Sequence, residues 1–126
     1  MLAAMARPSH VRDAVHALLG ERHAWTVDEA HAELGERGVA ADRASVHRAL
    51  VHLHEAGAAE RFEVGDGRAR FERSGHHHEH IVCSDCGIVA AVPGCLVDEA
   101  AVAARTGFAV SGHRLTLTGV CGECSA

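Results

Sequence analysis

The chain has 126 residues, of which 48% are apolar but only 3% aromatic, and its formal net charge is -5. This length supports one or two small domains with lean cores and excludes a large enzyme with a deep catalytic cavity. No stretch has the pattern of a membrane-spanning helix or a secretory signal, so the sequence predicts a cytoplasmic protein.

The first predicted helix spans residues 9–19, where apolar side chains recur at helical spacing and Gly20 follows. Thr26 and Glu29 have the pattern of a capping box, in which each side chain accepts a hydrogen bond from the other residue's backbone amide. The sequence therefore predicts a second helix that begins after Thr26 and ends near Arg37.

A third helix is expected after Asp42, whose carboxylate can cap its first turn, and Gly57 supplies a stop. Its apolar face consists of Val46, Ala49, Leu50 and Leu53. Its opposite face presents Arg43, His47 and Arg48. Such a helix fits two interpretations, a helix that reads DNA or a helix whose arginines simply face solvent.

Two short alternating segments flank the turn sequence at residues 65–67, Gly-Asp-Gly, which is typical of a β-hairpin. Three helices followed by a hairpin is the element order of a winged helix-turn-helix. We therefore predict an α+β chain with a winged-helix DNA-binding domain at residues 1–74. Ten of the twelve arginines lie in this part of the chain.

Residues 75–126 show two short apolar segments, an alanine-rich helical segment from Leu96 to Arg105, and one or two further strand-like segments. This order predicts a small α/β domain. A domain of this size has too little core to be stable without a metal or a partner chain.

Four of the five cysteines form two Cys-x-x-Cys pairs, Cys83/Cys86 and Cys121/Cys124, separated by 34 residues. In a reducing compartment such pairs bind metal more often than they form disulfides. Four thiolates make the closed shell that structural Zn²⁺ prefers, so we predict a structural zinc site without an open catalytic position, in a protein that is not an enzyme. The fifth cysteine, Cys95, is expected to be a small buried apolar residue.

Four histidines and a glutamate precede the first cysteine pair. Because side chains alternate along an extended strand, His76, His78 and His80 are expected on one side and His77 and Glu79 on the other. The cluster therefore predicts two separate metal-binding sets, each completed by residues from elsewhere in the chain.

These features resemble the ferric uptake regulator family of bacterial metal-sensing repressors. The resemblance covers Val11 to Cys124, and its most specific parts are HHHEHIVCSDCG at residues 76–87, the isolated His113, the final CGEC and SVHRAL in the third helix. It implies a homodimer that binds a double-stranded DNA operator through its winged helices, with residues 75–126 as the metal-binding dimerisation domain. The paired cysteines match the family's structural zinc site.

The resemblance also implies a regulatory metal site between the two domains. Its expected ligands are His23, Glu72, His78 and His80. A second site, within the dimerisation domain, is expected to use a set that includes His77, Glu79 and His113.

The second site departs from the family pattern at Leu96, where the family usually has a carboxylate. Glu99 is expected to take its place, and Asp98 and Cys95 are alternative donors.

The DNA contacts implied by the resemblance come from the third helix. They are Arg43, Ser45, His47 and Arg48. His47 stands where the family commonly has tyrosine, so it keeps a hydrogen-bonding group but lacks the phenol's apolar contact with a thymine methyl.

The expected regulatory ligands are nitrogen and oxygen atoms without a thiolate, which favours Fe²⁺ or Mn²⁺ over Zn²⁺ when cellular availability decides. We therefore predict an iron-responsive repressor of metal-homeostasis genes, with a zinc-responsive regulator as the closest alternative. A zinc-binding interaction or metal-buffering protein is a further alternative. A zinc nucleobase deaminase fits poorly, because Val120 replaces the proline that precedes its cysteine pair.

Overall fold

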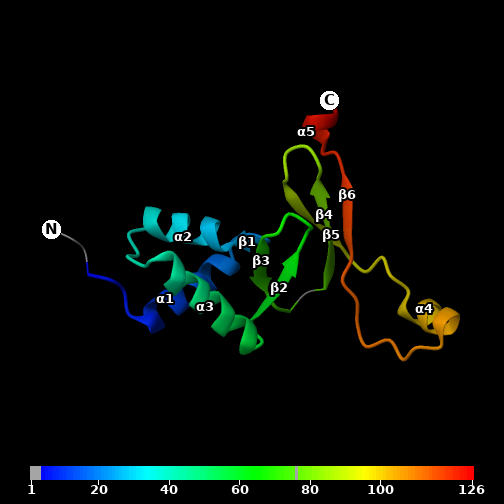
Figure 1. Cartoon of the computed structure of the whole chain (residues 1–126), viewed down its shortest axis with the longest axis horizontal. Coiled ribbons are helices and arrows are strands. Elements are labelled where there is room, and N and C mark those ends of the chain that lie inside the picture. Colours follow the sequence, from blue (N-terminus) through cyan, green and yellow to red (C-terminus); the bar gives the residue numbers. More distant parts are fainter. Residues whose placement is uncertain (1–3, 76) are drawn as a thin grey trace. The chain divides into compact units, whose positions relative to one another are not determined.

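The computed structural model describes residues 4–75 and 77–126. The chain divides into two compact units, with the boundary between residues 75 and 76, and Figure 1 labels their helices and strands. Within the described residues, no helix has both the length and the apolar character needed to cross a membrane. His76, expected on the same side of the histidine strand as His78 and His80, lies outside the described residues.

The described part of the first unit contains the three predicted helices, α1 (Pro8–Leu19), α2 (Val27–Glu36) and α3 (Arg43–Glu55). Their starts follow from local chemistry. The capping box between Thr26 and Glu29 is complete, with hydrogen bonds of 2.8 and 3.1 Å. The Asp42 carboxylate accepts from the Ser45 amide at 2.7 Å and caps α3. Gly57 follows α3 with a positive φ, as expected for a glycine that ends a helix.

The core of the first unit lies where the helices face one another. The apolar face predicted for α3 is confirmed, because its members are buried: Val46, Ala49, Leu50 and Leu53. They belong to one cluster with buried residues of the other helices and of the sheet, including Leu18, Leu34 and Phe71. The opposite face of α3 is therefore left to solvent.

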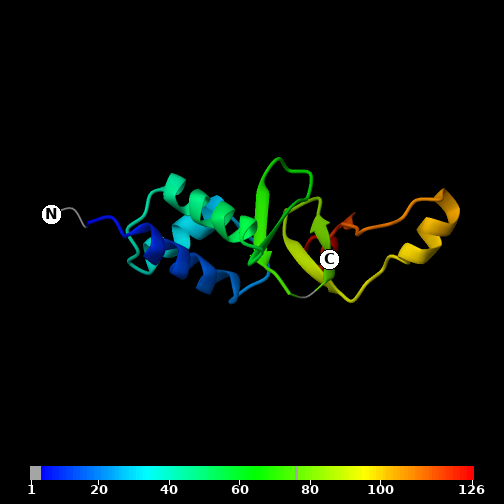
Figure 2. The same ribbon diagram turned by 90° about the horizontal axis from the view of Figure 1, so that it is seen from below.

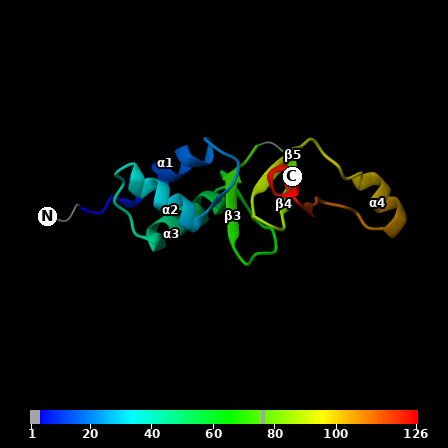
Figure 3. The same cartoon turned by 90° about the horizontal axis from the view of Figure 1, so that it is seen from above.

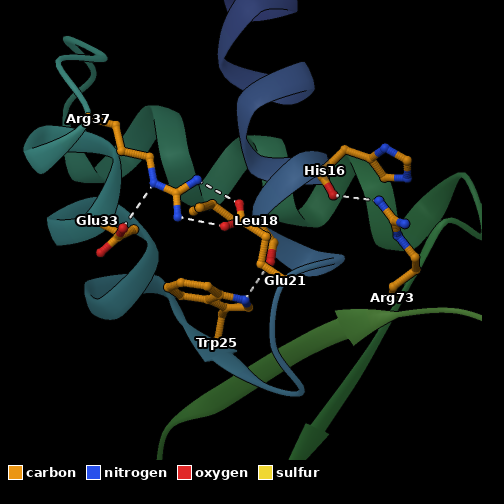
Figure 4. A network of polar contacts seen from close by, with 7 residues as sticks. All are labelled: His16, Leu18, Glu21, Trp25, Glu33, Arg37 and Arg73. Atoms are coloured by element: carbon orange, nitrogen blue, oxygen red, sulfur yellow. Dashed lines mark hydrogen bonds and ion pairs between the residues drawn. The ribbon is translucent and has the colours of Figure 1, made fainter.

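Polar contacts join α1, α2 and the strand region at the edge of this core (Figure 4). The indole nitrogen of the buried Trp25 donates to the Leu18 carbonyl at 2.9 Å. The Arg37 guanidinium binds Glu21 at 2.6 Å and Glu33 at 2.9 Å. These contacts connect the ends of α1 and α2 and place the segment between them, which contains His23.

A small antiparallel sheet completes the first unit, with strand order β1-β3-β2. Its strands are β1 (Trp25–Thr26), β2 (Ala59–Glu63) and β3 (Ala69–Arg73). The hairpin predicted around residues 65–67 is confirmed, and an ion pair of 2.9 Å between Arg70 and Asp66 braces its turn. The helices of this unit lie on one side of the sheet (Figures 1 and 3).

The second unit contains a mixed sheet of order β5-β4-β6, in which β4 is antiparallel to β5 and parallel to β6. Its elements are β4 (His78–Cys83), β5 (Val89–Pro93), α4 (Glu99–Thr106), β6 (Thr116–Gly119) and α5 (Gly122–Ser125). The predicted strand–strand–helix–strand order is present. The helix begins at Glu99 rather than Leu96, because Asp98 caps it, and the short α5 was not predicted.

The second unit has almost no apolar interior among its described residues. Of the residues that the structure describes in this unit, Cys83 is the one buried apolar residue. Large apolar side chains are instead exposed, and they include Ile88, Leu96, Val102, Phe108 and Val120. Figures 1 and 2 show α4 extending away from the sheet of this unit on two long connecting segments. The prediction that this domain lacks a sufficient core of its own is therefore confirmed.

Candidate metal centres and a candidate DNA-binding surface

The two cysteine pairs meet in the second unit because β4 and β6 run in parallel. Cys83 is the last residue of β4 and is paired with Gly119 at the end of β6, so the loops that follow both strands leave the same end of the sheet. The ligand atoms of Cys83, Cys86, Cys121 and Cys124 all lie within 4.8 Å of one another. The structure thus brings together the four residues predicted for structural zinc.

The spacing of the sulfurs fits zinc. Tetrahedral Zn²⁺ with bonds of about 2.3 Å places neighbouring sulfurs about 3.8 Å apart, and the Cys86 and Cys121 sulfurs are 3.8 Å apart. The Cys83 sulfur accepts hydrogen bonds from the amides of Cys121 and Cys86, which lower its pKa to about 6. The neighbouring sulfurs of Cys121 and Cys86 raise the pKa of Cys124 to about 12. Without a cation Cys124 therefore stays a neutral thiol, and all four sulfurs can be thiolates together only around a bound cation.

Two of the four residues expected in the regulatory site meet within the first unit. The Glu72 carboxylate of β3 is buried and lies 3.2 Å from Nδ1 of His23. His23 is in the segment between α1 and β1, and its ring lies near Phe62, with centroids 6.3 Å apart. A buried carboxylate beside an imidazole forms half of a ligand set for a divalent cation.

The other two residues of that set meet within the second unit. His78 and His80 lie on β4, and their ring centroids are 4.9 Å apart. The predicted alternation along this strand is therefore confirmed for the described residues, since His77 instead contacts Glu79, at 2.9 Å. Each unit by itself thus holds one half of the expected regulatory ligands.

The opposite side of β4 carries the second expected ligand set. The Glu79 carboxylate is only 1% exposed and lies 3.3 Å from Nε2 of His113. Burial tends to raise the pKa of Glu79, but the hydrogen bond from the Leu96 amide and the neighbouring His113 and His77 outweigh it and lower that pKa. The carboxylate is therefore a buried anion between two imidazoles.

The fourth member of this cluster is Cys95, an alternative donor for the second site, and not Glu99, the residue expected there. Cys95 has a ligand atom within 4.8 Å of those of His77, Glu79 and His113. The expectation that Cys95 is buried is wrong, because it is exposed. Glu99 lies 3.5 Å from Nδ1 of His113, the ring nitrogen that faces away from Glu79.

The exposed face of α3 carries the predicted DNA-contacting residues. Arg43, His47 and Arg48 are exposed, and Ser45 is partly buried. Arg43 is held by a 2.6 Å ion pair with Asp28 at the start of α2, and this bond lowers the pKa of the Asp28 carboxyl. Arg48 donates to the Ser45 hydroxyl at 3.0 Å.

Two hollows flank this face of α3, and each is lined in part by an arginine that was not among the predicted DNA contacts. One, of about 190 Å³, lies towards the hairpin and is lined in part by His47 and Arg68. The other, of about 270 Å³, lies towards α1 and is lined in part by Arg48 and Arg12. The place of Arg68 directly after the Gly-Asp-Gly turn is a sequence signal that marks it as a hairpin-tip residue.

Comparisons with known proteins agree with this arrangement. The model of the ferric uptake regulator family matches residues 4–118. The chain is 32% identical over 114 residues to the ferric uptake regulation protein of Neisseria gonorrhoeae, covering 86% of this chain and 79% of that protein. It is 36% identical over 84 residues to the Bordetella parapertussis ferric uptake regulation protein, covering 64% of this chain but only 60% of that protein.

Solved structures show the same fold. The ferric uptake regulator of Vibrio cholerae matches with a TM-score of 0.77 and 28% identity, over 94% of this chain and 92% of that chain. The zinc uptake regulator FurB of M. tuberculosis matches with a TM-score of 0.54 and 30% identity, over 94% and 95% of the two chains. The described fold is thus an N-terminal winged helix followed by a small C-terminal α/β dimerisation-type domain.

Proposed function

Because this chain belongs to the ferric uptake regulator family, a family of metal-responsive transcriptional regulators, we propose that it is a homodimeric repressor whose DNA binding depends on a bound metal. The observation that carries this proposal is that the expected DNA-binding helix lies in one unit while the expected regulatory ligands are divided between both units. The first unit presents the exposed face of α3, and each unit holds one half of the expected regulatory ligands. Such a division suits a switch in which a ligand fixes two domains in one arrangement.

The DNA-binding role is supported by the chemistry of α3. Its apolar face is buried in the core of the first unit, so the exposed face with Arg43 and Arg48 can contact a DNA groove. Arg12 and Arg68 flank this face from α1 and the hairpin and extend it with positive charge. Arginines on one helix face and at a hairpin tip are what a winged helix uses to hold phosphates and base edges.

Homodimer formation is supported by the second unit. Its exposed apolar side chains, among them Phe108 at 74% exposure and Val120 at 49%, would be costly to leave in water. Burying them against a second copy of the same unit supplies the core that one copy lacks. Structural Zn²⁺ held by the paired cysteines fastens the chain end to β4 and adds binding free energy to folding.

The regulatory site is proposed to form when the two halves are joined by one ion. His23 and Glu72 would come from the first unit, and His78 and His80 from the second. When bound, the ion supplies positive charge to four donors and links the winged helix to the dimerisation domain. A coupling free energy of about 1–3 kcal/mol, typical of allostery, is enough to change operator occupancy several-fold or more.

Fe²⁺ is the proposed regulatory ion, with Mn²⁺ of similar preference, because the four donors are nitrogen and oxygen atoms only. Zn²⁺ is the closest alternative, and one observation favours it: the M. tuberculosis protein named a zinc uptake regulator is 30% identical over nearly the whole chain. In vitro affinity cannot separate the two, since Zn²⁺ binds most nitrogen and oxygen sites more tightly than Fe²⁺.

The test combines metal analysis with operator binding. Purified protein that retains its structural zinc is titrated with Fe²⁺, Mn²⁺ or Zn²⁺ against DNA carrying its own promoter. Metal-dependent retardation of that DNA, with little retardation of unrelated DNA of equal length, is the expected result. Protein that binds the metals but never discriminates between the two DNAs would instead be a metal-buffering or interaction protein.

A further inference from the structure

We infer that Cys95 is the fourth ligand of the metal site on β4, which makes this site a zinc-class centre with one thiolate. The other ligands are His77, Glu79 and His113. The inference rests on the proposed function only in taking this cluster as a metal site, and it is independent of DNA binding. It also gives Glu99 a different part, that of a positioning residue.

The distances support a single tetrahedral ion. With bonds of about 2.0–2.1 Å to nitrogen or oxygen and about 2.3 Å to sulfur, tetrahedral Zn²⁺ separates a nitrogen and an oxygen by about 3.3 Å, and a nitrogen and a sulfur by about 3.5 Å. The corresponding distances are 3.3 Å from Nε2 of His113 to Oε2 of Glu79, and 3.6 Å from the same nitrogen to the Cys95 sulfur. His77 lies 2.9 Å from the other Glu79 oxygen, with its ring edge-on to His113.

The fold gives Cys95 this position directly. Cys95 follows β5, the strand that pairs with β4, and the amide of the next residue, Leu96, donates to Oε2 of Glu79. This hydrogen bond holds the segment with Cys95 next to the Glu79 carboxylate, which would bind the same ion. Cys95 was expected to be a buried apolar residue, and this prediction is wrong because its thiol lies in an exposed polar cluster and not in a core.

Glu99 lies at the wrong nitrogen of His113 to be a ligand of the same ion. Nε2 of His113 faces Glu79 and Cys95, whereas Nδ1 lies 3.5 Å from Oε1 of Glu99. A histidine that binds a metal through one ring nitrogen commonly donates its other N–H to a carboxylate, which fixes the tautomer and the ring orientation. Nδ1 of His113 is buried and forms no hydrogen bond among the described residues, and Glu99, in the first turn of α4, is the carboxylate placed to accept its N–H when an ion binds at Nε2.

The thiolate changes which ion the site prefers. Thiolate donors favour Zn²⁺ and other thiophilic ions, whereas the regulatory residues offer only nitrogen and oxygen donors. The chain therefore holds, in addition to the Cys₄ set, two sets that differ in softness. The set with Cys95 retains zinc under conditions in which the regulatory set exchanges its ion with Fe²⁺ or Mn²⁺.

Cadmium NMR of the full-length protein tests the ligand assignment, because the cadmium chemical shift depends on the number of bound thiolates. The wild-type protein should show three signals, from four, one and no thiolates. In Cys95→Asp the intermediate signal should move to the region of nitrogen and oxygen ligands, while the Cys₄ signal stays in place. An intermediate signal that is absent in the wild type, or unmoved in the variant, overturns the inference.

Affinity separates the ligand from the positioning residue. Zn²⁺ competition with a chelator should show a loss of roughly 10–100-fold at this site in Glu99→Gln, the usual effect of removing an outer hydrogen-bond partner, with the intermediate cadmium signal retained. Cys95→Ala should lose more affinity than Glu99→Gln and should also lose that signal. The inference is contradicted if Cys95→Ala and Glu99→Gln lose the same Zn²⁺ affinity and both variants keep the intermediate cadmium signal. Operator binding by the wild type, measured in parallel, reports on the proposed function separately.

Discussion

The Cys83 sulfur accepts a hydrogen bond from the backbone amide of Cys121 at 3.3 Å, although the two residues are 38 positions apart in the chain. A second amide, that of Cys86, donates to the same sulfur at 3.5 Å. Both cysteine pairs thus converge on the Cys83 thiolate, which lies at the buried end of β4. The four cysteines therefore come together only when β4 and β6 are paired.

Replacing Cys83 tests the structural role of this set. Cys83→Ser removes a sulfur ligand and the acceptor of both amides, so the protein should lose one zinc per chain, melt at lower temperature and dimerise poorly. Zinc analysis, thermal unfolding and sedimentation measure these effects. Ser111→Ala, at an exposed position of the same unit outside the ligand sets, is the control and should keep the zinc content and the dimer. A zinc-depleted Cys83→Ser protein that remains a stable dimer would show that the set is not structural.

The capping box at α2 allows a prediction about the first unit alone. Thr26→Ala removes the oxygen that accepts from the Glu29 amide, and loss of such a cap costs about 0.5–2 kcal/mol. Denaturant unfolding should show a lower midpoint with an unchanged slope. Ser9→Ala, at an exposed position in the first turn of α1, should change the free energy of unfolding by no more than about 0.5 kcal/mol. Equal effects of both changes would argue against the cap.

The sequence predicted the first unit well because its signals are local. The helix caps at Thr26 and Asp42 and the Gly-Asp-Gly turn each act within four residues, so their effect does not depend on the rest of the fold. Strand β1 escaped prediction because two residues carry no periodicity, and it exists only through its pairing with β3.

The candidate sites were predictable where strand alternation or Cys-x-x-Cys spacing sets them. Alternation along β4 correctly separated His77 and Glu79 from His78 and His80. Spacing offered Cys95 only as one of several alternative donors, because its position depends on how the chain leaves β5 and on the hydrogen bond from Leu96 to Glu79. Arg12 was not selected because its place beside Arg48 arises from the packing of α1 on α3.

Replacing Arg48 tests whether the exposed face of α3 binds DNA. Arg48→Ala removes an exposed guanidinium from α3 without touching the core, so metal content and melting temperature should stay unchanged. Operator binding should weaken by about 1–3 kcal/mol if Arg48 contacts a base edge. If it contacts only a phosphate, the slope of log affinity against log salt should fall by roughly one unit with little change in sequence preference.

Arg105→Ala is the matched control for this experiment, because Arg105 is an exposed arginine on α4 in the other unit. Its removal should leave operator binding unchanged. If Arg48→Ala binds the operator like the wild type at every salt concentration, α3 is not the helix that contacts DNA.

Replacing Glu72, whose carboxylate is buried, tests both the regulatory site and the identity of its ion. Glu72→Gln keeps the size of the side chain but removes the charge beside His23, so it should lose the metal response while retaining the Cys₄ zinc. His80→Ala should act in the same way from the second unit. Glu55→Gln, at the exposed end of α3, is the control and should respond like the wild type.

The readout for these variants is repression of a reporter in cells limited separately for iron and for zinc. The reporter should be derepressed in wild-type cells under iron limitation, because a site with only nitrogen and oxygen donors is expected to be filled by Fe²⁺ when cellular availability decides which ion binds. Glu72→Gln and His80→Ala should be derepressed under both conditions, with structural zinc still present in the purified proteins. Release of the wild type only under zinc limitation would replace iron by zinc as the sensed ion. It would leave the chain's place in its family unchanged, since that rests on the match over residues 4–118.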